Sequence, residues 1–349
     1  MPRLILLSLC VLIANLVRAD QVDDYINSQM QSLSVPGMAL TVLKNGKEIK
    51  TAGYGVANLE LDVPATRESV FELGAISSQF TAGGIVLLQE AGKLSFDDPI
   101  SKFLPNTPSI WSGVTIRHCL THTSGLKSYA YMDGFEFRYH LTQQDFIRLI
   151  AEYPLEFEPG SKFSYSPTDY TLLGHIIASA SGQSYWSYLQ AKIFRPLKMN
   201  STYERNPLNI IPNRANGYVK LKTGGFENRD YDLTDMFAAA NTATTVVDFA
   251  KWDNALNGKT LFSDENRKLF WSSSKLEGGA NNNTGFMFRI GKFRGNTEHS
   301  LVGATGGFCS AYLRFPETGY TIFILVNDTD ANMSITLAHG VANFYITSK

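Results

Sequence analysis

The sequence predicts an α+β fold in which both ends of the chain build one antiparallel sheet around an inserted, mostly helical region. Near the start, segments 37–44 and 48–56 flank Asn45-Gly46, a dipeptide typical of two-residue hairpin turns. Near the end, segments 310–315 and 320–326 are predicted strands joined by a Pro-Glu-Thr-Gly turn. Segments with helical apolar spacing lie between these pairs, and this order predicts helices beside a shared sheet.

The expected helices follow from the same periodicity. A first helix is predicted over 22–33 and a terminal helix over 335–345. Four more segments between the strand pairs have helical spacing: 81–91, 142–152, 168–181 and 185–194. We therefore assign 20–95 plus 240–349 to the sheet region and 96–239 to the helical region.

Composition excludes several classes of protein. The 349 residues are 44% hydrophobic, which is enough apolar mass for one large or two intimately built domains. The 31 basic and 32 acidic residues give a net charge of −1 without runs of like charge, so a nucleic-acid partner is not expected. Gly306-Gly307 lacks the Gly-Lys-Ser/Thr that completes a phosphate loop, and no cofactor is expected.

The first residues predict secretion. Arg3 precedes the apolar run Leu4 to Val17, which is too short to span a bilayer comfortably, and small residues at Val17 and Ala19 predict cleavage after Ala19. Residues 1–19 are therefore assigned to a signal peptide, and no membrane association is expected. Secretion gives meaning to four candidate N-glycosylation sites: Asn200, Asn282, Asn327 and Asn332.

Two cysteines remain after the predicted cleavage, Cys119 and Cys309. Secretion permits a single disulfide between them, and two buried free thiols fit the sequence equally well. No Cys-x-x-Cys pair indicates zinc or redox chemistry.

Four collinear motifs carry a family resemblance. They are FELGAISSQFTA at 71–82, HCLTHTSGL at 118–126, the stretch from FEPG at 157–160 through FSYSP at 163–167 to YTLLG at 170–174, and VGATGG at 302–307. Together they resemble the serine beta-lactamase and penicillin-binding-protein superfamily, in the branch of class C enzymes, DD-peptidases and related esterases. The resemblance covers about residues 22 to 345 and implies the beta-lactamase/transpeptidase-like fold.

The same resemblance implies a damaged catalytic site. The family's nucleophilic serine and its lysine, one helical turn apart, correspond to Ala75 and Ser78. A methyl group cannot attack a carbonyl, and a serine cannot act as an amine base. Tyr165 retains the family tyrosine, whereas Pro167 replaces the asparagine of the second motif and Ala304 replaces the His or Lys of the third. No catalytic residue is therefore expected, although backbone N–H groups at Ala75 and near Gly307 could still bind a carbonyl oxygen.

Other residues invite functional readings that the sequence does not favour. Ser272 and Lys275 form an S-x-x-K outside the helix that such a motif needs, so a solvated loop is the better interpretation. Ser77 adjoins the nucleophile position but points away from it on a helix. His118 and His122 are four residues apart without a Glu or third ligand, so no metal site is expected.

Three functions remain open from the sequence. The first is a secreted, inactive member of the family that binds a partner or has a structural role, with extracellular matrix components or a small ligand in the vacant cleft as partners. Among secreted invertebrate proteins it resembles the gigasin type of mollusc-shell protein, although it has no Asp-rich tract. The second is a hydrolase or esterase with altered or residual activity. The third is a receptor-like module that holds a peptide or small acid.

Overall fold

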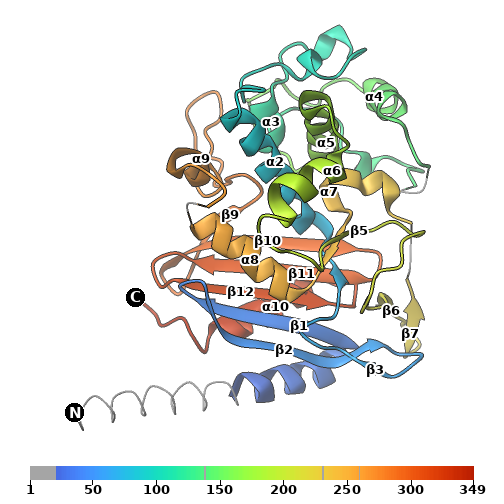
Figure 1. Cartoon of the computed structure of the whole chain (residues 1–349), viewed down its shortest axis with the longest axis vertical. Coiled ribbons are helices and arrows are strands. Elements are labelled where there is room, and N and C mark those ends of the chain that lie inside the picture. The colour runs from blue at the N-terminus through green and yellow to red at the C-terminus, as the bar shows by residue number, and fades with distance from the viewer. Residues whose placement is uncertain (1–20, 137–138, 230–231, 259) are drawn as a thin grey trace.

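A seven-stranded antiparallel sheet forms the centre of the computed structural model, which describes residues 21–136, 139–229, 232–258 and 260–349. The predicted signal peptide lies outside the described residues. The strand order is β3-β2-β1-β12-β11-β10-β9, so the first and last long strands are neighbours (Figure 1). The strands are β1 (Gly37–Lys44), β2 (Lys47–Asn58), β3 (Val63–Pro64), β9 (Arg289–Phe293), β10 (Asn296–Thr305), β11 (Phe308–Phe315) and β12 (Tyr320–Val326). This arrangement confirms the predicted fold class.

The hairpins at the two ends of the chain form as their turn residues predict. Asn45 and Gly46 both have positive φ, as a type I′ turn between β1 and β2 requires. β1 pairs with β12 over its length, from Met38 opposite Val326 to Lys44 opposite Tyr320. Both strands are apolar on both faces because helices cover the sheet from two sides.

The larger helical layer covers one face of the sheet (Figure 1). Its α-helices are α2 (Ser78–Glu90), α3 (Ile116–Leu120), α4 (Gln143–Ala151), α5 (Pro167–Ser181), α6 (Tyr185–Leu189), α7 (Phe237–Ala240), α8 (Val246–Asn257) and α9 (Asp264–Leu269). A π-helix, η5 (Gln190–Phe194), continues α6, and short 3₁₀ helices are η1 (Gly74–Ser77), η2 (Ile100–Lys102), η3 (Ser109–Trp111), η4 (Tyr129–Tyr131) and η6 (Thr234–Met236). Small strands accompany them: β4 (Phe71–Glu72), β5 (Tyr203–Glu204), β6 (Tyr218–Lys220), β7 (Phe226–Asn228) and β8 (Thr242–Thr244).

The opposite face is covered by the helix over 21–33 and by α10 (Ala331–Ala342), which pack in a second apolar core. The terminal helix was expected over 335–345, but it begins four residues earlier. The Asp330 side chain accepts a hydrogen bond from the backbone N–H of Asn332 and so caps the helix at that point.

The central helix α2 is buried on almost every side. Gly83 and Gly84 allow this packing, because an added Cβ would lie 2.8 Å from Trp252 and from Ile177, respectively. The helix therefore holds its first residue, Ser78, in a fixed position beside the sheet, together with Ala75 of η1 just before it.

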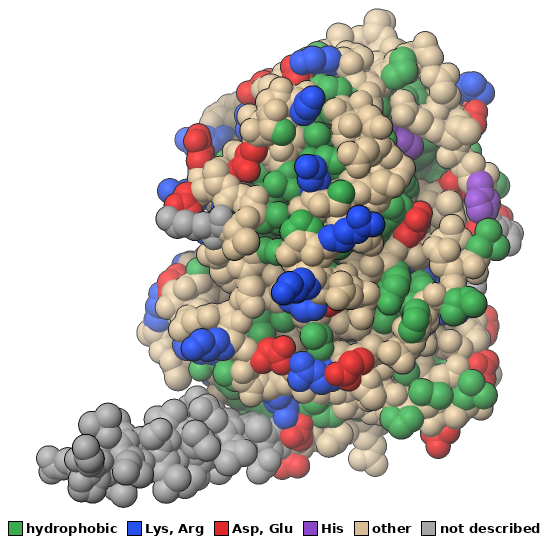
Figure 2. Space-filling view, viewed as in Figure 1, with side chains coloured by type: hydrophobic (Ala, Val, Ile, Leu, Met, Phe, Trp, Pro, Cys, Tyr) green, Lys and Arg blue, Asp and Glu red, His purple; other side chains and the backbone are tan. Residues whose placement is uncertain are grey.

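Charged side chains of both signs are spread over the face shown in Figure 2, as expected for a chain of near-zero net charge. Among the described residues, every helix is too short or too polar to cross a membrane.

Candidate functional site

The first motif occupies the start of the buried central helix. Ala75 lies in η1 and is partly exposed, whereas Ser78 begins α2 and is 1% exposed. The Ser78 hydroxyl donates a 2.8 Å hydrogen bond to the Ala239 carbonyl, so it is committed to a structural contact. Ser77 is also buried, and its hydroxyl accepts the backbone N–H of Thr242. Neither serine offers an exposed oxygen nucleophile.

Strand β10 lies directly against the start of this helix. A Cβ added to Gly303 would lie 2.0 Å from the Leu73 carbonyl oxygen and 3.0 Å from the Ala75 backbone nitrogen. A Cβ added to Gly74 would lie 2.5 Å from the Ala304 nitrogen. The structure thus brings Ala75 and Ala304 together across 229 positions of sequence (304 − 75).

The second motif faces the same region from α5. Pro167 is buried at the first position of α5, where its missing N–H costs no helical hydrogen bond. Tyr165 precedes it, is 38% exposed, and packs its ring 4.8 Å from that of His122. Burial of part of the ring raises the pKa of Tyr165, which favours the protonated phenol at neutral pH.

Beside these residues is a groove of about 930 Å³, called the cleft here. Tyr165, Met287, Leu301 and Val302 line it, whereas none of Ala75, Ser78, Pro167 and Ala304 is among its described lining residues. The Ala304 side chain is exposed. Because side chains alternate along a strand, Leu301 shares the η1-facing side of β10 with Gly303. From β10, Leu301 and Val302 line the cleft with Tyr165, together with the polar residues Glu298 and Ser300.

The sequence reading missed Leu301, Val302 and Met287 as cleft residues. The third-motif match names Ala304, whose backbone lies beside Gly74 of η1 although its side chain is exposed. Leu301 and Val302 line the cleft from the residues of β10 just before Ala304. No sequence signal indicated Met287, which reaches the cleft from a loop.

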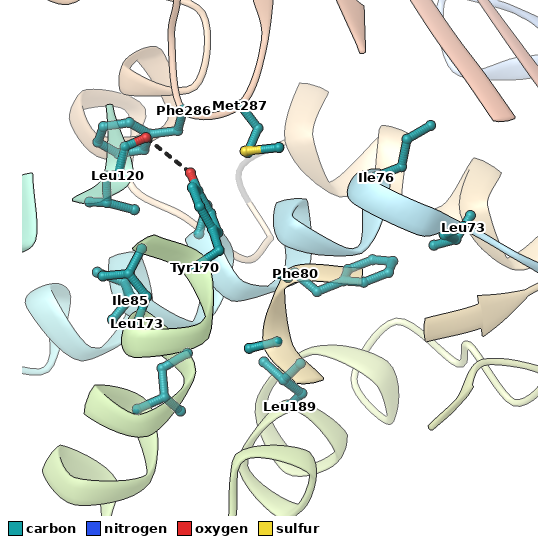
Figure 3. Close-up of a cluster of buried hydrophobic side chains, with 14 of the residues drawn as sticks. Leu73, Ile76, Phe80, Ile85, Leu120, Tyr170, Leu173, Leu189, Phe286 and Met287 are labelled. Atoms are coloured by element: carbon teal, nitrogen blue, oxygen red, sulfur yellow. Dashed lines mark hydrogen bonds between the residues drawn. The ribbon is translucent and has the colours of Figure 1, made fainter. Parts of the chain in front are cut away.

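Met287 closes the inner end of the cleft. Its sulfur lies 3.1 Å from Nε2 of His122, and Figure 3 shows it between Tyr170 on α5 and Ile76 on η1. Its φ of +70° is uncommon for a residue with a long side chain, so the surrounding packing enforces this position.

A buried polar network supports His122 from behind. Nδ1 of His122 lies 3.1 Å from the Asp169 carboxylate, and the Ser124 hydroxyl donates a 2.5 Å bond to the other Asp169 oxygen. Burial raises the pKa of Asp169 despite these partners. Because Ser124 contacts Asp169 rather than the imidazole, the three residues do not form a nucleophile–base pair. His118 lies outside this network. Its Nδ1 accepts a hydrogen bond from the backbone N–H of Thr115 in the capping box of α3.

The backbones of η1 and β10 lie against each other where the nucleophile would stand. Ala75 lies in the first turn of η1, whose N–H groups have no partner within the helix. In β10, residues 296, 298 and 300 face β9, so Val302 and Ala304 direct their N–H and C=O groups to the same side, beyond the end of β9. The second donor was expected near Gly307, whose N–H donates to the Thr305 carbonyl at 2.8 Å, whereas the backbone nitrogen of Ala304 lies beside Gly74.

The structure also shows the state of the two cysteines and the exposure of the four candidate glycosylation sites. Cys119 and Cys309 are both buried and unpaired, which excludes the disulfide alternative in this structure. Asn200 and Asn332 are exposed, whereas Asn327 is fully buried and its amide donates to the Val56 carbonyl. The Asn282 amide nitrogen is also buried, so only Asn200 and Asn332 could carry a glycan on the folded protein.

Comparisons with known proteins agree with this geometry. The Beta-lactamase family model matches residues 22–342. The chain is 30% identical to penicillin-binding protein 4* of Bacillus subtilis over 82% of its own length and 67% of that protein. It is 29% identical to protein flp of Staphylococcus aureus, of which it spans 62%. Among solved structures, the octameric penicillin-binding protein homologue of Pyrococcus abyssi superposes with a TM-score of 0.82 at 26% identity, covering 94% of this chain and 78% of that one. A class C beta-lactamase has a TM-score of 0.79 at 22% identity, covering 95% of this chain and 97% of that one, and so supports the fold.

Proposed function

Because the chain belongs to the beta-lactamase family, we propose that it uses the family cleft to bind a ligand and not to transfer an acyl group. The observation that carries this proposal is Ala75, a methyl group at the nucleophile position beside the backbone of β10. Acyl transfer also needs a base, but Ser78 is hydrogen-bonded to a carbonyl and Tyr165 is held protonated. Binding of a carbonyl group needs only the N–H donors, and these remain.

The ligand class that fits the cleft is an extended peptide. The edge of β10 beyond β9 directs the N–H and C=O groups of Val302 and Ala304 toward the cleft side. An added strand could pair with this edge and place one carbonyl between Ala75 and Ala304. Phe163, Tyr165 and Met287 supply apolar surface for its side chains.

A peptide-binding titration tests this proposal. The probe is a capped pentapeptide with a fluorescent label, followed by polarisation. Val302→Pro removes one outward-facing donor at an edge where proline is tolerated, so binding should weaken about 2- to 10-fold, the worth of one hydrogen bond. Val302→Ala is the matched control and should bind as the wild type does. Absence of saturable binding by the wild type, or equal binding by both variants, would contradict the proposal.

Secretion and a place in an extracellular matrix are the finer part of the proposal. The apolar run at 4–17 with cleavage predicted after Ala19 supports secretion. The resemblance to gigasin-type shell proteins supports a matrix location. Mass spectrometry of an acid-dissolved extract from the source tissue should find peptides of this chain starting at Asp20, and their absence from every extracellular fraction would count against it.

The second candidate, a hydrolase with residual activity, is favoured by the retained N–H pair. Such donors alone can leave a rate about 10³-fold above that in water. Slow ester turnover without a burst phase would support this candidate. If Val302→Pro abolishes ligand binding, the same variant should also lose this turnover.

A further inference from the structure

Three oxygen-bearing side chains follow β12 at alternate positions. Asp328, Asp330 and Asn332 occur in the run Asp-Thr-Asp-Ala-Asn, which leads into the first turn of α10. This spacing matches the first, third and fifth ligand positions of calcium-binding loops. The remaining loop positions differ, because Met333 stands where such loops have glycine and His339 where they have glutamate. Spacing alone therefore assigns no site.

The buried carboxylate of Asp328 provides an independent observation. Asp328 is 3% exposed and lines a pocket of about 420 Å³, together with Asp330, Asn332 and Thr336. Its Oδ1 accepts the Asp330 N–H at 3.1 Å, whereas its Oδ2 is buried without a hydrogen-bond partner among the described residues. A carboxylate oxygen excluded from water and left unpaired is costly unless a cation or donor reaches it.

The charges around the pocket leave room for a cation. Lys220 also lines it, but its ammonium donates to the Leu33 carbonyl at 3.3 Å and forms no ion pair with either aspartate within the described part of the chain. Two carboxylates and one ammonium give the pocket a net charge of −1. Burial raises the pKa of Asp328 even though Lys220 lowers it, which is consistent with an incompletely compensated negative charge.

We propose that this pocket binds a calcium ion through the side-chain oxygens of Asp328, Asp330 and Asn332, with water completing the coordination. Calcium accepts six to eight oxygen ligands in flexible geometry, whereas magnesium demands a near-ideal octahedron and dehydrates reluctantly. Two carboxylates and one amide make a weak site, and the expected dissociation constant is on the order of 10⁻⁴ to 10⁻³ M, as in extracellular calcium modules.

Calcium at this site would join three elements. Asp328 directly follows β12, Asp330 caps α10, and Tyr218 of β6 forms a backbone bridge with Asp328. A cation shared by Asp328 and Asp330 would therefore stabilise the start of α10 against the sheet edge. Because the site needs this folded arrangement, calcium should raise the melting temperature.

The test is calorimetric. The metal-free protein is melted in CaCl₂ or MgCl₂ up to about 10 mM at constant ionic strength, a range set by the expected affinity. Calcium at ten times the dissociation constant should raise Tm by about 2 °C, and magnesium should raise it less. Terbium luminescence gives a second readout, since added calcium should displace bound terbium.

Variants make the test specific. Asp328→Asn should abolish the calcium shift and leave the metal-free Tm unchanged or higher, because it removes a poorly compensated charge. Asn332→Ala, at an exposed position, should weaken calcium binding several-fold. Asp62→Asn is the matched control, an exposed aspartate with φ of +49° that asparagine also tolerates, and it should keep the full shift. The proposal fails if the wild type shows neither the calcium shift nor terbium displacement, or if Asp328→Asn responds as the wild type does.

Discussion

At the scale of single residues, the site differs from a catalytic one at four of the five polar positions of the family motifs, and only Tyr165 is retained. Ala75 has no nucleophilic atom, Ser78 is tied to the Ala239 carbonyl, and Pro167 and Ala304 lack the polar groups of the other two motifs. The losses affect all three motifs, whereas Arg289, Lys292 and Glu298 still supply charged groups to the cleft. Losses in all three motifs predict how attempts to restore the chemistry will behave.

Restoring the first motif alone should not restore activity. The double variant Ala75→Ser with Ser78→Lys supplies a nucleophile and an amine, but Pro167 and Ala304 still lack the polar groups of the other motifs. We expect no turnover of a chromogenic beta-lactam or nitrophenyl ester above the wild-type level. Measurable turnover by the double variant would show instead that Ala75 and Ser78 are the only defects.

Ser78→Lys should also destabilise the fold. It places an ammonium at a position that is 1% exposed and removes the bond to Ala239, so the free energy of unfolding should fall by about 2–4 kcal/mol. Ala75→Ser, at a partly exposed position, is the control and should change it by less than about 1 kcal/mol. Urea unfolding measures both, and equal stability of the two variants would contradict the assigned burial of Ser78.

At the scale of elements, the site depends on how closely β10 approaches η1. Gly303→Ala would place a methyl group 2.0 Å from the Leu73 carbonyl oxygen, so β10 or η1 must move. The free energy of unfolding should therefore fall by about 2–4 kcal/mol. Gly291→Ala on β9 is the matched control, because nothing lies within 4 Å of its added Cβ. Urea unfolding that leaves Gly303→Ala as stable as Gly291→Ala would show that this contact does not hold the cleft together.

Elements with strong local signals were predictable from the sequence, and those fixed by distant contacts were not. The β1–β2 hairpin followed from Asn45-Gly46, and α5 began within one residue of its expected start at 168. β9 was not predicted, and a strand at β10 was expected only through the resemblance of 302–307 to the family's third motif. The cleft role of Leu301 depends on which side of β10 faces η1, a tertiary relation that no single-sequence pattern contains. Met287 is placed by a loop whose positive φ is enforced by its surroundings.

At the scale of the whole molecule, half-buried His175 and buried His299 make stability depend on pH. Burial lowers the pKa of His175 to about 4, and burial with the nearby Arg314 lowers that of His299 to about 4. In the unfolded chain both titrate near 6.5. Between about pH 6.5 and 4 the unfolded chain therefore binds more protons, so these histidines cause stability to fall as the pH falls.

Replacement of one histidine tests that dependence. When the pH is lowered from 7 to 4.5, the free energy of unfolding of His175→Gln should fall by about 1–3 kcal/mol less than that of the wild type. His140→Gln, at an exposed position, is the control and should follow the wild type. Guanidinium unfolding at the two pH values gives the comparison, and identical pH dependence of all three proteins would show that His175 is not a buried neutral group.

The central claim is that the cleft forms no covalent acyl-enzyme, and intact-protein mass spectrometry tests it most directly. The wild-type chain is incubated separately with a penicillin and with a fluorophosphonate, and its mass is compared with that of the untreated protein. Because Ala75 has no nucleophile and Tyr165 is held protonated, the mass should remain unchanged with both reagents. A stoichiometric mass increase that maps to Ser77, Ser78 or Tyr165 would contradict the account and identify the chain as a hydrolase of altered chemistry.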